Sequence, residues 1–141
     1  MILRKKIESI FYDKILQDSP NLDLKKGLDV KELEELPYHI IDCQMVSENE
    51  DFPPRAGSFN AELRFIIEDN INNESYESYG NKIAGITCSI EDLTEIQNIC
   101  SESYPEIHIH DVWPAGNDSE RDNYNIYNTY NYSLVFEHLN V

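Results

Sequence analysis

Two histidines placed two residues apart are the side chains of this chain best suited to chemistry. His108 and His110 stand in a segment where apolar and polar residues alternate, as they do in a β-strand with one buried face. Residues two apart in a strand point to the same face, so the two imidazoles could bind one metal ion. Asp111 is expected on the opposite face, and a third ligand would have to come from elsewhere, such as His39 or His138.

These histidines also have interpretations that need no metal. On the wet face of an alternating strand they can simply be solvated. They also suit a pH-sensitive contact, because histidine changes its charge near pH ~6.5. A small enzyme that used His108, His110 and Asp111 would lose its activity when these residues were replaced. We expect no bound metal and no cofactor.

The remaining reactive side chains form no recognisable catalytic motif. Acidic residues are so frequent that adjacent pairs such as Glu34–Glu35 carry little information. The sequence holds no phosphate-binding loop, no dinucleotide-binding glycine pattern, no H-E-x-x-H and no G-x-S-x-G. Cys43, Cys88 and Cys100 are widely spaced and odd in number, which predicts free buried thiols in a reducing cytosol. We therefore predict that the protein is not an enzyme.

The chain is strongly acidic, and its charge is uneven. Its 141 residues include 11 basic and 27 acidic side chains, a formal net charge of -16. Residues 1–55 carry 8 basic and 12 acidic residues, whereas residues 56–141 carry 3 and 15. Such a surface repels nucleic-acid phosphates, which argues against sequence-specific DNA binding. It suits a basic partner, a wall past which DNA moves without adhering, or simply solubility.

The composition predicts a single folded domain over residues 1–141. Hydrophobic residues make up 40% of the chain and aromatic residues 11%, which is enough for a core. No apolar run approaches the ~20 residues that span a bilayer. The basic start of the chain is not followed by the apolar core and cleavage site of a signal peptide. We expect no contact with a membrane.

Three helical stretches are expected to support the strands. Residues 2–17 predict an amphipathic helix that ends before Pro20, with charged side chains such as Glu8 and Lys14 away from its apolar face. A second helix is predicted from about Ser75, with Gly80 and Gly85 weakening it, and a short third one over residues 91–100. Residues 20–36 are charged and irregular, with at most a helical turn near residues 30–36.

Four strands are predicted, over residues 38–46, 58–68, 105–113 and 124–139. The second alternates most cleanly, which indicates one buried and one wet face, as in an antiparallel sheet. Polar segments 47–57 and 114–123 are expected to be loops, the latter long enough to project as an arm. The order of elements predicts an α+β domain: a four-stranded, mainly antiparallel sheet with helices packed on one face and long projecting loops.

Several stretches follow the layout of a known family. The stretches that carry the likeness are Leu36–Ile41, Asp51–Gly57, Phe59–Ile67, Tyr104–Ile109, Val112–Gly116 and Glu120–Arg121. Together they resemble the tail-terminator and head–tail joining (neck) proteins of long-tailed bacteriophages. Taken in order, the stretches are similar to that family's first strand, its loop, its second strand, its third strand, its arm and the start of its closing strand. The likeness covers residues 2–139 as a pattern and includes no diagnostic motif.

The resemblance implies a structural virion protein that is assembled in the host cytoplasm. Such a protein forms a homo-oligomeric ring, usually a hexamer, that caps the tail tube and faces the head connector or portal side. Its partners would be further copies of itself, the tail tube protein and the connector, and DNA would pass through the ring without specific binding. The family offers no catalytic residues to carry over.

The same resemblance makes the two polar loops candidate contacts between subunits or with partners. The candidate interface residues are Asp51, Arg55, Trp113, Asn117, Asp118, Glu120, Arg121 and Tyr127. Trp113 has a second interpretation as a core residue beneath the loop, because a large aromatic side chain suits a core as well as an interface. Tyr130 and Tyr132 are expected to pack against the core.

A function of another class remains open from the sequence. An acidic protein can imitate DNA and inhibit a nucleic-acid-binding enzyme, which predicts tight, salt-sensitive binding to a basic nuclease. Its carboxylates would have to be spaced like phosphates, whereas those of this chain are scattered along the sequence.

Overall fold

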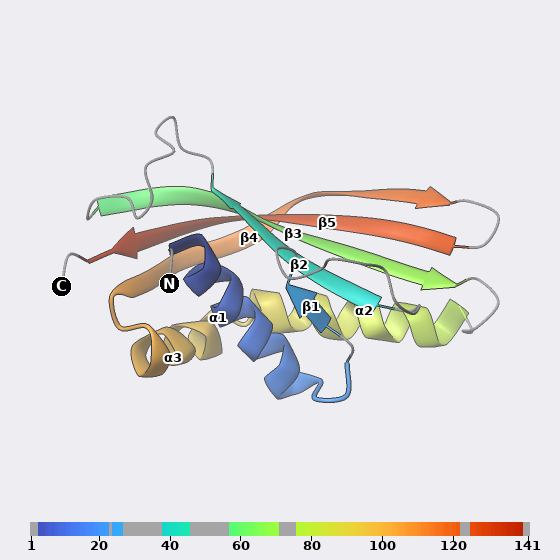
Figure 1. Cartoon of the computed structure of the whole chain (residues 1–141), viewed down its shortest axis with the longest axis horizontal. Helices are drawn as coiled ribbons and strands as arrows, with labels where there is room; N and C mark the ends of the chain where they lie inside the picture. Colours follow the sequence, from blue (N-terminus) through green and yellow to red (C-terminus); the bar gives the residue numbers. More distant parts are fainter. Residues whose placement is uncertain are drawn as a thin grey trace.

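The computed structural model describes residues 3–22, 24–26, 38–45, 57–70, 76–121 and 125–139. These residues form an α+β fold in which helices and strands follow the order α1, β1, β2, β3, α2, α3, β4, β5 (Figure 1). The helices are α1 (Leu3–Asp18), α2 (Tyr76–Glu91) and α3 (Leu93–Ser103). The strands are β1 (Leu24–Lys26), β2 (Tyr38–Met45), β3 (Gly57–Asn70), β4 (Ile107–Arg121) and β5 (Asn125–His138).

The strands form one sheet in the order β1-β2-β3-β5-β4, so the predicted four-stranded sheet is wrong. The additional strand is β1, whose Leu24–Lys26 pair in parallel with residues 39–41 of β2. The other three pairings are antiparallel. A strand of three residues shows no alternation, and two of its residues are lysines. Nothing in that stretch could therefore signal a strand before its partner β2 was in place.

The predicted arm over residues 114–123 is also wrong for the part that the structure describes. Pro114–Arg121 form the second half of β4, which pairs with β5 as far as Arg121 opposite Ile126. Polar residues were expected to form a loop, but a strand can also carry them where both of its faces are exposed to solvent, as they are at Pro114–Asp118. The backbone hydrogen bonds to β5 hold this half strand extended without an apolar pattern. The predicted loop over 47–57 lies outside the described residues except for Gly57, which begins β3.

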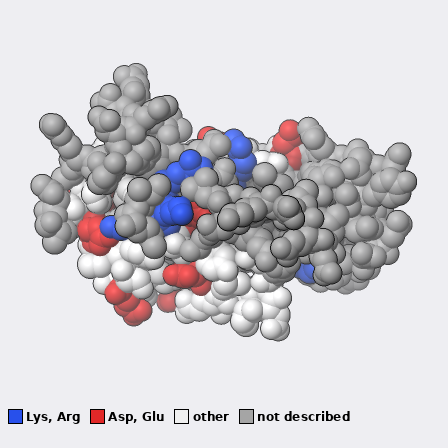
Figure 2. All heavy atoms as spheres, in the orientation of Figure 1, with Lys and Arg blue, Asp and Glu red and all other residues white. Residues whose placement is uncertain are grey.

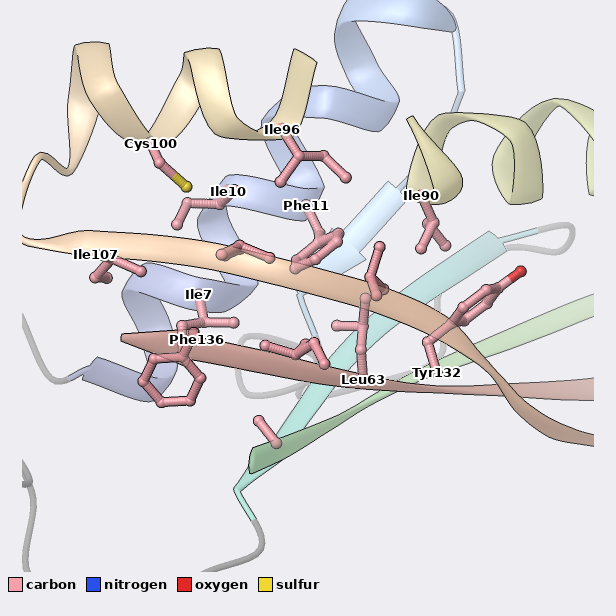
Figure 3. Packing of buried hydrophobic residues seen from close by; sticks show 14 of the residues in the cluster. Ile7, Ile10, Phe11, Leu63, Ile90, Ile96, Cys100, Ile107, Tyr132 and Phe136 are labelled. Carbon is pink, nitrogen blue, oxygen red and sulfur yellow. The ribbon is translucent and has the colours of Figure 1, made fainter. Parts of the chain in front are cut away.

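All three helices lie on one side of the sheet, here called the covered face (Figure 1). Figure 3 shows how side chains from α1, α2 and α3 meet those of β3, β4 and β5 in one core. Phe136 and Leu63 are fully buried there, and the ring of Phe136 stacks on that of Phe59 with centroids 5.6 Å apart. Tyr132 is buried and Tyr130 packs against the same core, as predicted.

Helix α1 is enclosed more fully than an amphipathic helix on a sheet. Glu8 and Lys14, expected on its wet side, are both buried. The helix contacts α2, α3, β1 and β2, so few of its sides reach water. The Lys14 ammonium pairs with the carboxylate of Asp18 and lies 3.5 Å from that of Asp92. These carboxylates compensate the buried charge, which is why a lysine can occupy this position.

Helix α2 runs through both glycines that were expected to weaken it. Gly80 and Gly85 are exposed, and a methyl group added at either would meet nothing within 4 Å. The helix tolerates them because its stability comes from buried positions such as Ile86 and Ile90. Within the described residues, no helix is both long and apolar enough to cross a membrane.

Candidate interaction surface

The side of the sheet away from the helices is here called the open face, and in β3 and β5 the described side chains alternate between it and the covered face. In β5, Leu134 and Phe136 are buried, whereas the intervening Val135 and the adjacent Ser133 remain partly accessible. The described side chains assigned to the open face include Ser58, Asn60, Glu62 and Arg64 of β3, Thr129, Asn131, Ser133, Val135 and Glu137 of β5, and His108, His110, Asp111, Trp113 and Asp118 of β4. This surface is polar, with Trp113 and Val135 as its apolar members.

A β-bulge in β4 gives the open face one additional side chain. Ile109 pairs with Phe136 and Asp111 pairs with Val135, so His110 has no partner of its own in the ladder. Burial follows this shift, because Ile109 and Val112 are buried while both residues between them are exposed. The expectation that Asp111 points away from the histidines is therefore wrong. An inserted residue breaks the alternation on which that expectation depended.

The two histidines do share a face and lie against each other. The ring centroids of His108 and His110 are 4.6 Å apart, in an edge-to-face arrangement. The Nε2 atom of His110 lies 3.2 Å from Oε2 of Glu137 on β5, and both side chains are more than 40% exposed. Glu137 was missed from the sequence, because it is 27 residues from His110 and only the β4–β5 register brings them together.

The other predicted ligands are not at this cluster. His138 pairs with Ile107, a buried residue of the covered face, so its position in the ladder belongs to that face. His39 is on β2, which β3 and β5 separate from β4. In the part of the chain that the structure describes, no group of three or more His, Cys, Asp or Glu residues is placed to hold a metal ion.

Trp113 is an interface candidate and not a core residue. It is 41% exposed and pairs with Ser133 in the β4–β5 ladder. Leu139, just beyond β5, is the other large hydrophobic residue with comparable exposure among the described side chains. Tryptophan is enriched at binding hot spots because its large ring contributes much apolar contact for few rotatable bonds.

A second bulge follows Pro114. Pro114 pairs with Tyr132 and Asn117 pairs with Tyr130, so two residues of β4 stand opposite the single Asn131 of β5. Gly116 supplies the backbone conformation for this bulge, with φ at 116°. The bulge leaves a hollow of about 240 Å³ lined by Pro114, Gly116, Asn117, Tyr130, Asn131 and Tyr132.

The outer edge of β4 is long but interrupted. Because β4 is the last strand of the sheet, the described residues include no strand on its outer side. Pro114 offers no N–H group, and the two bulges break the regular spacing of the others. Bulges and prolines are the features that keep exposed edges from pairing with arbitrary strands. Binding at this edge would therefore depend on specific side chains.

The remaining predicted interface residues are distributed over the same strands. Asn117 and Asp118 are exposed in the second half of β4. Glu120 stands opposite Tyr127 in the ladder, and Arg121 is the next residue of β4. Asp51 and Arg55 lie outside the described residues. The structure thus brings the 113–121 candidates and Tyr127 together on one strand pair.

Charge is distributed unevenly over the fold. Residues 1–26, which include α1 and β1, hold six of the 11 Lys and Arg residues and four of the 27 Asp and Glu residues. Figure 2 shows the face on which α1 lies toward the viewer. The basic side chains visible there gather near the centre, with acidic side chains around them. Lys6 donates a 2.8 Å hydrogen bond to Glu106, which lowers the pKa of that carboxyl group.

The described cysteines do not point to chemistry. Cys100 is free and buried, and desolvation raises the pKa of its thiol to about 11, so the reactive thiolate is disfavoured. Cys88 is free but exposed, so the expectation that it is buried is wrong. The side chain of Cys43 lies outside the described part. Burial also raises the pKa of Tyr132 to about 12, which keeps its hydroxyl neutral beneath the sheet.

Comparisons with known proteins leave the family open. No protein-family model matches the chain, and no curated protein matches it. Twenty-six chains of solved structures match. One of them, a protein without a descriptive name, has a TM-score of 0.49 and 10% sequence identity, over 99% of this chain and 94% of that chain. A likeness at this level carries no information about function.

Proposed function

We propose that this chain is a structural virion assembly protein, a tail terminator or neck component that forms a homo-oligomeric ring at the head–tail junction of a long-tailed bacteriophage. The sequence resemblance described above supports this proposal. Its proposed partners are further copies of the chain, the tail tube protein and the connector on the head side. We propose no catalytic role.

The observation that carries the proposal is the outer strand β4. It combines a long outer edge with an exposed Trp113 and exposed polar side chains on both sides of that residue. A large aromatic side chain at an outer strand offers apolar area that a neighbouring subunit can remove from water. An assembly protein buries such a side chain against a neighbour.

The acidic composition supports the same function through electrostatics. A ring at the head–tail junction must let DNA pass without retaining it. A wall with net negative charge repels phosphates and provides no binding sites for them. The chain carries a net charge of -16, and most of its acidic residues lie after residue 26, in the part that builds β2 to β5 and the two later helices.

The proposal is tested by the mass and shape of the purified protein. Light scattering over a range of concentrations should show a discrete oligomer of the 16.4 kDa chain, and negative-stain images should show closed rings. Added to polymerising tail tube protein, the ring should stop tube growth and appear at one end of each tube. A particle that stays monomeric at every concentration and binds neither tube nor connector protein would end the proposal. Tight, salt-sensitive binding of that monomer to a basic nuclease would favour DNA mimicry.

A further inference from the structure

The outer edge of β4 is closed along its first half. The side chain of Gln97 on α3 donates a 2.9 Å hydrogen bond to the backbone carbonyl of Ile109. The backbone N–H group of Val112 donates a 2.9 Å hydrogen bond to Oδ1 of Asp111. Figure 1 shows α3 beside the start of β4 and away from its far end. A further strand could therefore add to this first half only by displacing these hydrogen bonds.

The second half of this edge, from Trp113 to Asn117, carries no such hydrogen bond within the described residues. These five residues are all exposed, and β4 is the last strand of the sheet. Alternate residues of an antiparallel strand direct their N–H and C=O groups away from its neighbour. A further strand can pair with these groups. We call this stretch the open edge.

The residues that flank the open edge are acidic. Asp111 precedes it and Asp118 follows it, and both carboxylates are exposed on the open face. Residues 83–120, which include α3 and nearly all of β4, contain eight acidic residues and no Lys or Arg. Arg64, a basic side chain of the open face, belongs to β3, which β5 separates from β4. The open edge therefore attracts positive charge.

We propose that an extended segment of a partner protein, carrying Lys or Arg, adds as a strand to the open edge. Its backbone pairs with β4, and its basic side chains lie near Asp111 and Asp118. The inference rests on the assembly role proposed above, because it names the chemistry of one neighbour in that assembly. Charge disfavours a second copy at this place. A two-fold contact would bring the same aspartates together in copies that each carry -16.

The side chain of Trp113 lies beside the proposed strand. An added strand continues the sheet in its own plane, whereas side chains stand roughly perpendicular to that plane. The indole ring can therefore contact another subunit across the open face while one of its sides meets a side chain of the added strand. Trp113 is the single tryptophan of the chain, so its fluorescence reports on this edge.

Titration with three short synthetic peptides that lack tryptophan tests the contact. The first alternates Lys and Val, the second alternates Glu and Val, and the third alternates Lys and Pro. The Lys–Val peptide should bind and move the emission of Trp113 to shorter wavelength. The Lys–Pro peptide has the same charge but lacks N–H groups for pairing, so it should bind at least ~10-fold more weakly. The Glu–Val peptide should not bind, because like charges repel.

Charge-neutralised variants locate the binding site. Asp111→Asn with Asp118→Asn should weaken binding of the Lys–Val peptide about 10-fold. Asparagine keeps an oxygen that can accept the hydrogen bond from Val112. The matched control, Glu95→Gln with Glu102→Gln on α3, changes the net charge by the same amount and should bind as the parent does. Calorimetry gives the affinities, and circular dichroism should show that all variants are folded.

The outcomes separate this inference from the proposed function. If the Lys–Pro peptide binds as tightly as the Lys–Val peptide, or if the α3 control loses as much affinity as the edge variant, general charge attraction explains the binding and the strand contact is wrong. If the emission shifts with the concentration of the parent alone and the resulting dimers exclude the peptide, a second copy occupies the edge and the inference also fails. A parent that binds the Lys–Val peptide here but forms no ring and binds neither tube nor connector protein supports the contact and contradicts the assembly role.

Discussion

The covered and open faces belong to the same three strands, β3, β5 and β4, yet their side chains differ in burial and polarity. On the covered face, Leu63, Leu134 and Phe136 are fully buried under three helices. On the open face, the neighbouring positions carry polar side chains, with Trp113 as a large exposed aromatic. One face holds the fold together. The other supplies side chains that the fold does not use, and these are available for contacts with other molecules.

The two faces also differ in whether they can accept the extra residue of a bulge. A bulge on the covered side would open a gap in a packed core, whereas the bulge at His110 adds a residue toward water. Close packing tolerates little change in the number of side chains, since even a methylene is felt. A solvated face accepts an additional residue at little cost. The bulge at His110 therefore lies where it affects contacts and not the core.

The largest expected difference between the faces is in stability. Phe136→Ala should lower the free energy of unfolding by about 3–5 kcal/mol, because it leaves a cavity beside Phe59. Val135→Ala, one residue away on the open face, should cost about 1 kcal/mol or less. Urea unfolding of both variants gives the comparison, and equal losses would show that the open face is also packed.

Self-association should depend on the open face and not on the core. Trp113→Ala should weaken assembly on the order of 10-fold or more while changing the free energy of unfolding by less than about 1 kcal/mol. Leu139→Ala is the matched control, since Leu139 is similarly exposed beyond the end of β5. Light scattering and urea unfolding measure the two effects. A tryptophan variant that unfolds easily but assembles normally would place Trp113 with the core.

A smaller effect is expected where α1 meets the start of β4. The hydrogen bond from Lys6 lowers the pKa of Glu106, so near pH 4 the folded state holds fewer protons than the unfolded state. Stability from this pair is therefore present above the ordinary pKa of 4.5 and is lost as the pH falls through the lowered one. Lys6→Met should cost about 0.5–1 kcal/mol at pH 7 and less at pH 3. Urea unfolding across this range tests it, and a loss that does not change with pH would contradict the assignment.

The smallest effect is expected for the ion pair on the open face. Glu137→Gln removes the carboxylate beside His110, but both side chains are more than 40% exposed. Exposed pairs contribute little because water solvates each partner when the pair is broken, so stability should change by less than about 0.5 kcal/mol. A loss of several times that amount in thermal or urea unfolding would mean that this cluster is part of the fold.

Strong local patterns could be interpreted without the structure. The apolar spacing in residues 2–17 predicted α1 to within one residue at each end, and the alternation in 58–68 predicted the centre of β3. The pairing of His108 and His110 on one face also followed from their spacing. Each of these signals comes from residues close together in the chain, where burial on one side imposes a period.

Other features depended on contacts between distant residues. The charged sequence around β1 forms a strand only because β2 offers it an edge, and Pro114–Arg121 are extended because β5 pairs with them. The burial of Lys14 required carboxylates from two elements, one on α1 and one before α3. Asp18 is only four residues from Lys14, but the carboxylate of Asp92 and the pairing strands left no local pattern in the sequence.

By itself, the sequence determined the identity of the main helices and strands, the two-sided character of the longest strands, and the excess of acid that any function must accommodate. Only the tertiary structure decided how many strands the sheet has, which residues lie at its edges, and that Asp111 joins the histidines on the open face. The physical reason is the distance along the chain over which each interaction acts. Periodic burial acts over a few neighbouring residues, whereas strand order, register and bulges are set by hydrogen bonds between segments that meet only when the chain is folded.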